Sequence, residues 1–358
     1  MWTNLLKITS QRWLAVVALL FAVIALIDVA NADTVTGALD RSSIKLLPTV
    51  HPFLLGASQA GARQVVVGER GVVMLSDDGG SNWRQSLTPV SVTLTSVRFA
   101  DDTHGFAVGH GGVVLATSDA GVTWERRLDG RDIVKLILAD AERSGDEGRI
   151  MQAKRFVEDG PDKPLLDLLV LDASRVVVVG AFGLALISED GGHSWVSWKE
   201  RLDNPSELHL YAIRARGSQI VIAGEQGLVR ISEDAGKTFS AVTTPYDGSF
   251  FTLELVGVSD IVLAGLRGNV WRSEDLGHIW SQMVAPTPAS IIASTLRADG
   301  ALVLVNQAGE LLTERSGGLR ALIDRPLPQL NGVLARSDGG LLLLGQQGTF
   351  IIGSGDLK

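Results

Sequence analysis

The chain has 358 residues, a formal net charge of −8 and no cysteine, and 46% of its residues are hydrophobic. The acidic balance argues against nucleic acid as the main partner, because a phosphate-binding surface needs clustered Lys and Arg. The absence of cysteine excludes disulfides, thiolate chemistry and cysteine-ligated metals.

The N-terminus has the pattern of an export signal. The first 12 residues carry Lys7 and Arg12 and no acid, an apolar run of 15 residues covers Trp13–Ile27, and Ala30 and Ala32 form a small-residue cleavage site. This order is typical of a secretory signal peptide. A membrane-spanning helix needs about 20 apolar residues. We therefore expect cleavage after Ala32 rather than a retained anchor, and an exported, periplasmic domain over residues 33–358.

One eight-residue pattern, Ser/Thr-x-Asp-x-Gly-x-x-Trp/Phe, occurs five times, and we call it the Asp box. The Asp suits a turn in which its carboxylate accepts backbone N–H groups, and the Gly supplies a positive φ. The aromatic residue then begins the next strand. We expect these residues to brace turns rather than to act as catalytic acids. The Asp and aromatic positions are Asp78 and Trp83, Asp119 and Trp124, Asp190 and Trp195, Asp234 and Phe239, and Asp275 and Trp280.

A second repeat, Gly-x-x-Gly between two apolar strands, precedes each Asp box. Six copies are intact and a seventh has Asn in the first place; they start at Gly68, Gly109, Gly180, Gly224, Gly265, Asn306 and Gly345. Four short strands per period of about 40 residues match a β-propeller blade. The sequence therefore predicts an all-β, seven-bladed propeller whose Gly-x-x-Gly motifs form two-residue hairpin turns.

Two departures from the period carry further predictions. Residues 129–164 interrupt it between blades 2 and 3, and apolar residues recur at helical spacing in Asp132–Arg143 and Asp146–Val157. We expect a helical hairpin on the same face as the Gly-x-x-Gly turns, either packed on the rim or serving as a docking element. The chain also ends soon after the third strand of blade 7. We expect Ser42–Pro48 to pair as the fourth strand of that blade and close the ring.

The second blade carries a family resemblance. Val97 to Phe99, Gly105 to Gly109, Gly112 to Leu115 and the box that ends at Trp124 resemble the photosystem II stability/assembly factor family. Its members are exported seven-bladed propellers built on bacterial-neuraminidase-type repeats. The resemblance implies a non-enzymatic assembly factor for a membrane complex, without a cofactor. In bacteria without photosynthesis it implies a link to exporters of the resistance-nodulation-division superfamily. The helical insertion departs from the photosynthetic pattern and favours another membrane client.

A search for catalytic residues leaves one alternative, a secreted carbohydrate-active propeller. A sialidase-like site needs an Arg triad, a Tyr nucleophile with a Glu partner, and an Asp acid. The chain has only Tyr211 and Tyr246, and no Arg-Ile-Pro stretch precedes the repeats. None of the six histidines has the paired spacing of metal ligands. We therefore predict no enzyme activity, no metal, no cofactor and no small-molecule substrate.

The residues inside the Gly-x-x-Gly turns are the candidate partner-binding residues. Arg70 and Arg267 are suited to an acidic or carboxylate-bearing partner; the alternative is that all are ordinary solvated turn residues. The leading hypothesis is a periplasmic scaffold that binds a membrane protein through this face. The candidates are Glu69, Arg70, His110, Phe182, Glu225, Gln226, Arg267 and Gln347.

Overall fold

The computed structural model describes residues 37–47, 49–315, 318–325 and 327–358, and the predicted signal peptide lies outside these ranges. Residues from Ala38 to Lys358 form one compact unit. Within it are seven antiparallel sheets, six with four strands and one with three. Among the described residues, no helix combines the length and the apolar character needed to cross a membrane.

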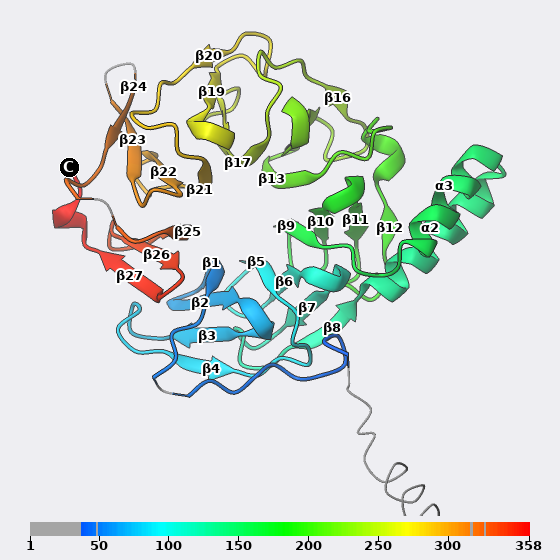
Figure 1. Cartoon of the computed structure of the whole chain (residues 1–358), viewed down its shortest axis with the longest axis horizontal. Coiled ribbons are helices and arrows are strands. Elements are labelled where there is room, and N and C mark those ends of the chain that lie inside the picture. The colour runs from blue at the N-terminus through cyan, green and yellow to red at the C-terminus, as the bar shows by residue number, and fades with distance from the viewer. Residues whose placement is uncertain (1–36, 48, 316–317, 326) are drawn as a thin grey trace, which may run out of the picture. The chain divides into compact units, whose positions relative to one another are not determined.

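The sheets follow one another in chain order (Figure 1). The first three are β1(Leu54–Ala60), β2(Arg63–Gly68), β3(Val73–Ser76) and β4(Arg84–Ser86); β5(Leu94–Phe99), β6(Gly105–Gly109), β7(Val114–Thr117) and β8(Glu125–Leu128); and β9(Leu165–Val170), β10(Val176–Gly180), β11(Ala185–Ser188) and β12(Val196–Ser197). The next two are β13(Leu210–Arg216), β14(Gln219–Gly224), β15(Val229–Ser232) and β16(Ser240–Ala241); and β17(Phe250–Leu255), β18(Ile261–Gly265), β19(Val270–Ser273) and β20(Ser281–Gln282). The last two are β21(Ile291–Leu296), β22(Leu302–Asn306), β23(Leu311–Arg315) and β24(Gly318–Ala321); and β25(Leu330–Ala335), β26(Leu341–Gly345) and β27(Gly348–Ile352).

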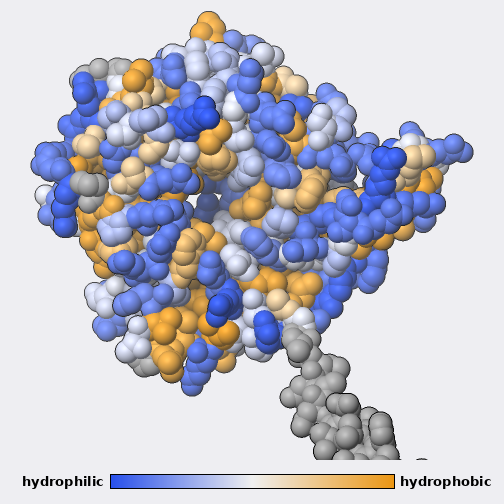
Figure 2. All heavy atoms as spheres, viewed as in Figure 1, coloured by the Kyte–Doolittle hydropathy of each residue, from blue (hydrophilic) through white to orange (hydrophobic). Residues whose placement is uncertain are grey.

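The sheets are arranged as a β-propeller. The first strand of each sheet packs on the first strand of the next, and β25 of the seventh packs back on β1 of the first (Figure 1). The second strands are buried along almost their whole length, as in Val176–Gly180 and Leu341–Gly345. Such short, continuous apolar runs fit strands that are covered on both faces. The space-filling view shows an opening at the centre (Figure 2).

Two helices lie between β8 and β9, where the sequence predicts the insertion. They are α2(Gly130–Ser144) and α3(Glu147–Glu158). The Asp129 side chain caps the start of α2, and Gly145, with a φ of 68°, ends it. Asp146 caps the start of α3 by accepting from the backbone N–H groups of Gly148 and Arg149. These caps set the bounds of both helices.

Each Asp box forms a self-contained corner between the third and fourth strands of its sheet. In the third copy, the Asp190 carboxylate accepts the Ser194 N–H at 2.8 Å and the Ser194 hydroxyl at 2.6 Å. The Ser188 hydroxyl donates to Asp190 at 2.8 Å and accepts the N–H of Gly192 at 2.8 Å. The indole N–H of Trp195 donates to the Gly192 carbonyl at 3.0 Å. The turn is therefore held by its own residues.

The N-terminal segment does not complete the seventh sheet, so that prediction was wrong. Residues 42–47 run beside β4 of the first sheet: the Ser43 N–H donates to the Thr88 carbonyl at 3.0 Å, and the Leu46 N–H donates to Gln85 Oε1 at 2.9 Å. Pro48 lies outside the described residues. Gln85 also donates to the Ile44 carbonyl at 2.6 Å, so its side-chain amide pairs with two backbone groups of the segment. The ring closes instead through packing and a bond from Asn331 Nδ2 to the Leu54 carbonyl at 3.0 Å.

An ion cluster centred on the buried Asp167 joins neighbouring first strands beside the central channel. Asp167 of β9 accepts the Ser96 hydroxyl at 3.0 Å, Arg214 Nη1 at 2.6 Å and the Ile213 N–H at 3.1 Å. Arg98 lies 3.8 Å from the same carboxylate. Burial opposes ionisation of Asp167, but the two guanidinium groups and the N–H outweigh it, and its pKa is lowered. One charge therefore links three sheets.

We predict that Asp167→Asn lowers the free energy of unfolding by about 3 kcal/mol, because it leaves two guanidinium groups without their buried counter-charge. Urea unfolding followed by circular dichroism measures the change. Asp132→Asn is the control, since Asp132 forms an exposed pair with Lys135 on α2 and exposed pairs contribute about 1 kcal/mol or less. Equal midpoints for the two variants would contradict the role given to Asp167.

A second prediction concerns acid stability. Hydrogen bonds from Asn82, Ser194 and Thr238 hold the pKa of Asp78, Asp190 and Asp234 at about 2, against an ordinary value of 3.8. Because these pKa values are lowered on folding, the stabilisation is complete above the unfolded value and is lost as pH falls from about 4 to about 2. Thermal unfolding should show the melting temperature falling through this window. Asp190→Asn should reduce that dependence, and a flat profile for the wild type would refute the account.

Candidate partner-binding face

Most of the Gly-x-x-Gly turns are one residue longer than predicted. In the first, Gly68 and Val72 pair across a loop of three residues, with the Gly68 N–H donating to the Val72 carbonyl at 3.0 Å. A Cβ on Gly68 would lie 2.0 Å from the carbonyl oxygen of Phe53, so the first glycine is required for space. Gly71 is required for its φ of 72°. The two-residue hairpin was therefore the wrong prediction for this turn, and it applies only to the seventh, where Gly345 pairs with Gly348.

The residue before the second glycine also has a positive φ. This residue is Arg70, Phe182, Gln226 or Arg267 in four of the first five turns, with φ between 52° and 58°. Non-glycine residues seldom adopt this region, and it costs roughly 1–2 kcal/mol each. All four side chains are exposed. The close packing around both glycines thus imposes an unusual backbone conformation, in which the residue before the second glycine has an exposed side chain.

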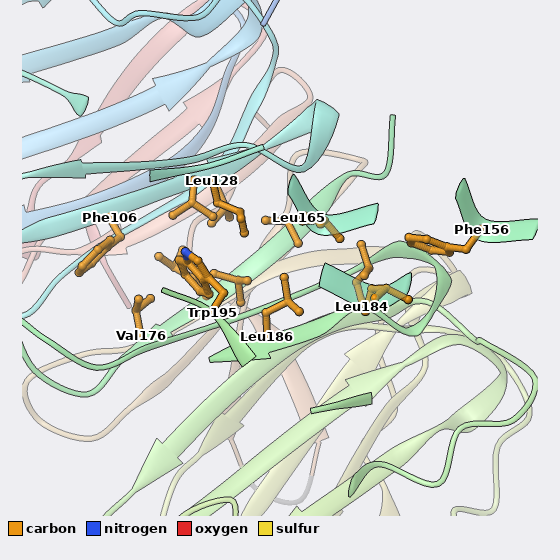
Figure 3. Close-up of a cluster of buried hydrophobic side chains, with 14 of the residues drawn as sticks. Phe106, Leu128, Phe156, Leu165, Val176, Leu184, Leu186 and Trp195 are labelled. Atoms are coloured by element: carbon orange, nitrogen blue, oxygen red, sulfur yellow. The ribbon is translucent and has the colours of Figure 1, made fainter. Parts of the chain in front are cut away.

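The helical pair stands on the second of these turns. A Cβ on Gly112 would lie 2.8 Å from Ile133 Cδ1 of α2, and the Gly111 N–H donates to Asp162 Oδ1 at 3.2 Å. The core continues into both helices, because Ile133 and Ile137 of α2 and Phe156 of α3 belong to one cluster of buried side chains. Figure 3 shows Phe156 in this cluster with Leu165 and Leu184. The helices are therefore a packed extension of sheets two and three.

A buried lysine fastens the helical pair to the third turn. Lys163 is 2% exposed, and its Nζ donates to the Gly160 carbonyl at 3.0 Å. The same ammonium lies 4.8 Å from the ring centre of Phe156 on α3 and 5.2 Å from that of Phe182 in the turn. Cation–π contacts of this kind stabilise by about 0.5–2 kcal/mol. Lys163 thus couples the insertion to a candidate binding residue.

Polar side chains beside Lys163 also connect the helical pair to the sheets, and we call this whole contact region, with Phe156, Lys163, Lys199 and His209, the junction. Lys199 Nζ lies 5.6 Å from the Phe156 ring and pairs with Glu207. Glu207 also accepts Gln152 Nε2 of α3 at 2.8 Å. The middle of α3 is therefore hydrogen-bonded, through Gln152, to the segment that connects the third and fourth sheets.

His209 links the third turn to the fourth. Its Nδ1 accepts the backbone N–H of Phe182 at 3.0 Å, and the backbone N–H of His209 donates to Glu225 Oε2 at 3.1 Å. The rings of Phe182 and His209 lie 5.2 Å apart, and the row of rings continues through Tyr211 to Phe251, both of which line the central channel. An aromatic path therefore leads from the turn face into the channel.

The structure brings together only some of the predicted binding residues. Phe182 and Glu225 meet through His209, and Gln226 follows in the same turn as Glu225. The others lie in four further turns around the ring: Glu69 and Arg70 in the first, His110 in the second, Arg267 in the fifth and Gln347 in the seventh.

The sequence placed Phe156 among the apolar residues of the predicted second helix. It did not identify Lys163, Lys199 or His209 as residues that connect the helices to the turns. Lys163 lies in a short irregular stretch after α3, where no periodicity marks a buried position. Within the described part of the chain, no group of three or more His, Asp or Glu side chains is placed to hold a metal ion.

Comparison with protein families identifies the class. The model of the photosynthesis system II assembly factor YCF48 family matches residues 80–157 and 154–321, which together exceed half of the chain. The chain therefore belongs to this family, as its resemblance indicated. A comparison with curated protein sequences found no match.

Solved structures support the fold. The structure titled "YCF48 bound to D1 peptide" has a TM-score of 0.62 at 17% identity, over 86% of this chain and 97% of that one. YCF48 from Cyanidioschyzon merolae has a TM-score of 0.63 at 14% identity, over 87% and 98%. The WD40 propeller domain of Doa1 has a TM-score of 0.61 at 12% identity, over 88% and 95%. At these low sequence identities, the comparison shows that this chain shares the β-propeller fold with the three structures.

We predict that Phe156→Ala loosens the helical pair. Removing a buried aromatic ring costs about 3–5 kcal/mol, and here it also removes the ring beneath Lys163 and Lys199. Hydrogen exchange should become faster across residues 130–158 while the sheets stay protected. Met151→Ala is the matched control, because Met151 lies on the same helix and is 57% exposed. If hydrogen exchange across residues 130–158 is the same in Phe156→Ala as in the wild type, Phe156 does not anchor the helical pair.

Proposed function

We propose that this protein is a non-enzymatic, periplasmic scaffold that binds a membrane protein through the face formed by its Gly-x-x-Gly turns and helical pair. The observation that carries the proposal is the junction at Lys163, which builds an ordered helical pair into that face. Family membership supports an assembly role, since the family is described as an assembly factor. One structural relative is described as bound to a peptide of D1.

The geometry favours this face over the Asp-box face as the binding surface. The Asp boxes use their own polar groups to brace their turns. The Gly-x-x-Gly turns instead leave the third side chain exposed on a backbone held by packing. Three Asp boxes also hold a non-glycine residue at positive φ, at Ala120, Ala235 and Leu276, so the Gly-x-x-Gly turns differ in presenting charged, amide and aromatic side chains at that position. Arg70 and Arg267 supply forked donors suited to carboxylates.

The proposed route to this partner is export. The basic, apolar and small-residue segments of residues 1–32 direct the chain to the periplasm and are then removed. The partner is a membrane protein or a subunit of a membrane complex with loops on the exported side. An exporter of the resistance-nodulation-division superfamily is one such client, as the family resemblance implies.

Charge reversal on the two faces tests the proposal. A tagged protein captures its partner from detergent-solubilised membranes of the source organism. The double variant Arg70→Glu/Arg267→Glu should weaken capture roughly tenfold or more, because a charged hydrogen bond contributes about 1.5–3 kcal/mol. Lys237→Glu is the matched control, an exposed cation inside the fourth Asp box.

Deletion of residues 131–160 tests the insertion directly, with circular dichroism to establish that the sheets remain folded. Loss of capture is expected. Equal capture by the wild type, the double variant and the deletion would overturn the assignment of this face. Cleavage of a glycan by the purified protein would overturn the non-enzymatic assignment in favour of a carbohydrate-active propeller.

A further inference from the structure

The seventh sheet has an open edge. Among the described residues, its outermost strand, β27, pairs only with β26, and Figure 1 shows it at the rim. The two-residue turn makes Gly345 and Gly348 a hydrogen-bonded pair, and bonded and non-bonded pairs alternate along an antiparallel ladder. The backbone N–H and C=O groups of Thr349 and Ile351 therefore point away from β26, toward the position of a fourth strand.

The six other sheets show what occupies that position in this fold. Each carries a fourth strand of two to four residues, antiparallel to the third. Exposed edges are usually protected by charged side chains or proline. β27 has neither, and Ile351 is 42% exposed. The outer edge of β27 therefore lacks the usual protection against pairing with another strand.

An apolar groove of about 400 Å³ lies beside this edge. Its walls include Leu47 and Val50 of the N-terminal segment and Met74 and Trp83 of the first sheet, and Thr349 of β27 forms part of its lining. No Asp, Glu, Lys or Arg lines it among the described residues. Because side chains alternate along a strand, a segment paired with β27 directs a side chain into this groove where it lies opposite Gly348 and Thr349. The groove also has the polar side chains of His51 and Gln85 in its lining, but most of its residues favour an apolar side chain there.

We propose that sheet seven is completed in trans by an extended segment of the partner polypeptide. The segment pairs antiparallel to β27 and inserts an apolar side chain into the groove beside Thr349, a mode of recognition known as β-augmentation. This inference rests on the proposed function, because it takes the segment to be part of the same partner. β27 begins directly after Gln347, in the seventh turn of the binding face, so a partner docked there reaches the edge without a gap.

A single extended chain fits this edge better than a second copy of the protein. The groove is a recess between β27 and the N-terminal segment, and residues 354–356 form a 3-10 turn immediately after the strand. A second copy would have to bring its own β27 into this recess together with the same flanking segments. A free peptide segment brings only its backbone and side chains.

Proline substitution tests the edge specifically. Ile351→Pro removes the outward N–H and leaves the pairing with β26 intact, and proline is tolerated on edge strands with the N–H side outward. Ile351→Ala is the matched control, since it removes the side chain and keeps the N–H. The probe is a fluorescent nine-residue peptide of alternating valine and threonine with a lysine at each end, and fluorescence anisotropy measures its binding to the full chain.

The wild type should bind this peptide saturably, with slower hydrogen exchange of the Thr349 and Ile351 amides. Ile351→Pro should weaken binding at least about tenfold, and Ile351→Ala by roughly threefold or less. Equal binding by the two variants, or no protection of β27, would overturn the inference. Dimerisation that protects β27 without peptide would also overturn it and assign the edge to a second copy.

The membrane-capture experiment separates this inference from the proposed function. If Ile351→Pro captures the membrane partner as well as the wild type while Arg70→Glu/Arg267→Glu does not, only the edge assignment fails. If the wild type captures no membrane protein, the proposed function itself fails.

Discussion

The packing of seven first strands around one channel is the constraint on which the rest of the structure depends. Each sheet is covered on both faces by its neighbours, so no sheet buries its apolar side chains alone. Asp167, on the first strand of the third sheet, adds an electrostatic link beside the channel, because it bonds both Ser96 of the second sheet and Arg214 of the fourth. Because the first and seventh sheets meet without exchanging a strand, closure relies on this packing, and the outer edge of β27 stays open.

The two kinds of turn are held in place by different interactions. An Asp box satisfies its own backbone groups with Asp, Ser and Trp, and so fixes the corner between third and fourth strands. A Gly-x-x-Gly turn depends on close contact with neighbouring backbone, as the position of Gly68 against Phe53 illustrates. In four of the turns, that contact holds a non-glycine residue at positive φ with its side chain exposed. The helical pair adds surface to the same face and is anchored there by Lys163 and Phe156.

Much of the fold was predictable because its signals are local. The repeat frames fix the third and fourth strands, and Asp129 and Gly145 mark the ends of α2 by ordinary capping chemistry. The placement of residues 42–47 was not predictable, because it depends on Gln85 and Thr88, which lie about 40 residues away in the chain. The same holds for Lys163, whose burial between Phe156 and Phe182 follows from the docking of an insertion against a turn. The individual candidate side chains were predictable as turn residues, but their connection through His209 required the structure.

Site-specific photo-crosslinking in intact cells tests the central claim, that the partner contacts the Gly-x-x-Gly face. A photoreactive residue replaces Gln226 in the fourth turn, Met151 on α3, or Glu233 in the fourth Asp box, all of which are exposed. The account predicts that Gln226 and Met151 give adducts with one and the same membrane protein, whereas Glu233 gives none. Adducts with that protein from Glu233 alone, or with equal yield from all three positions, would contradict it.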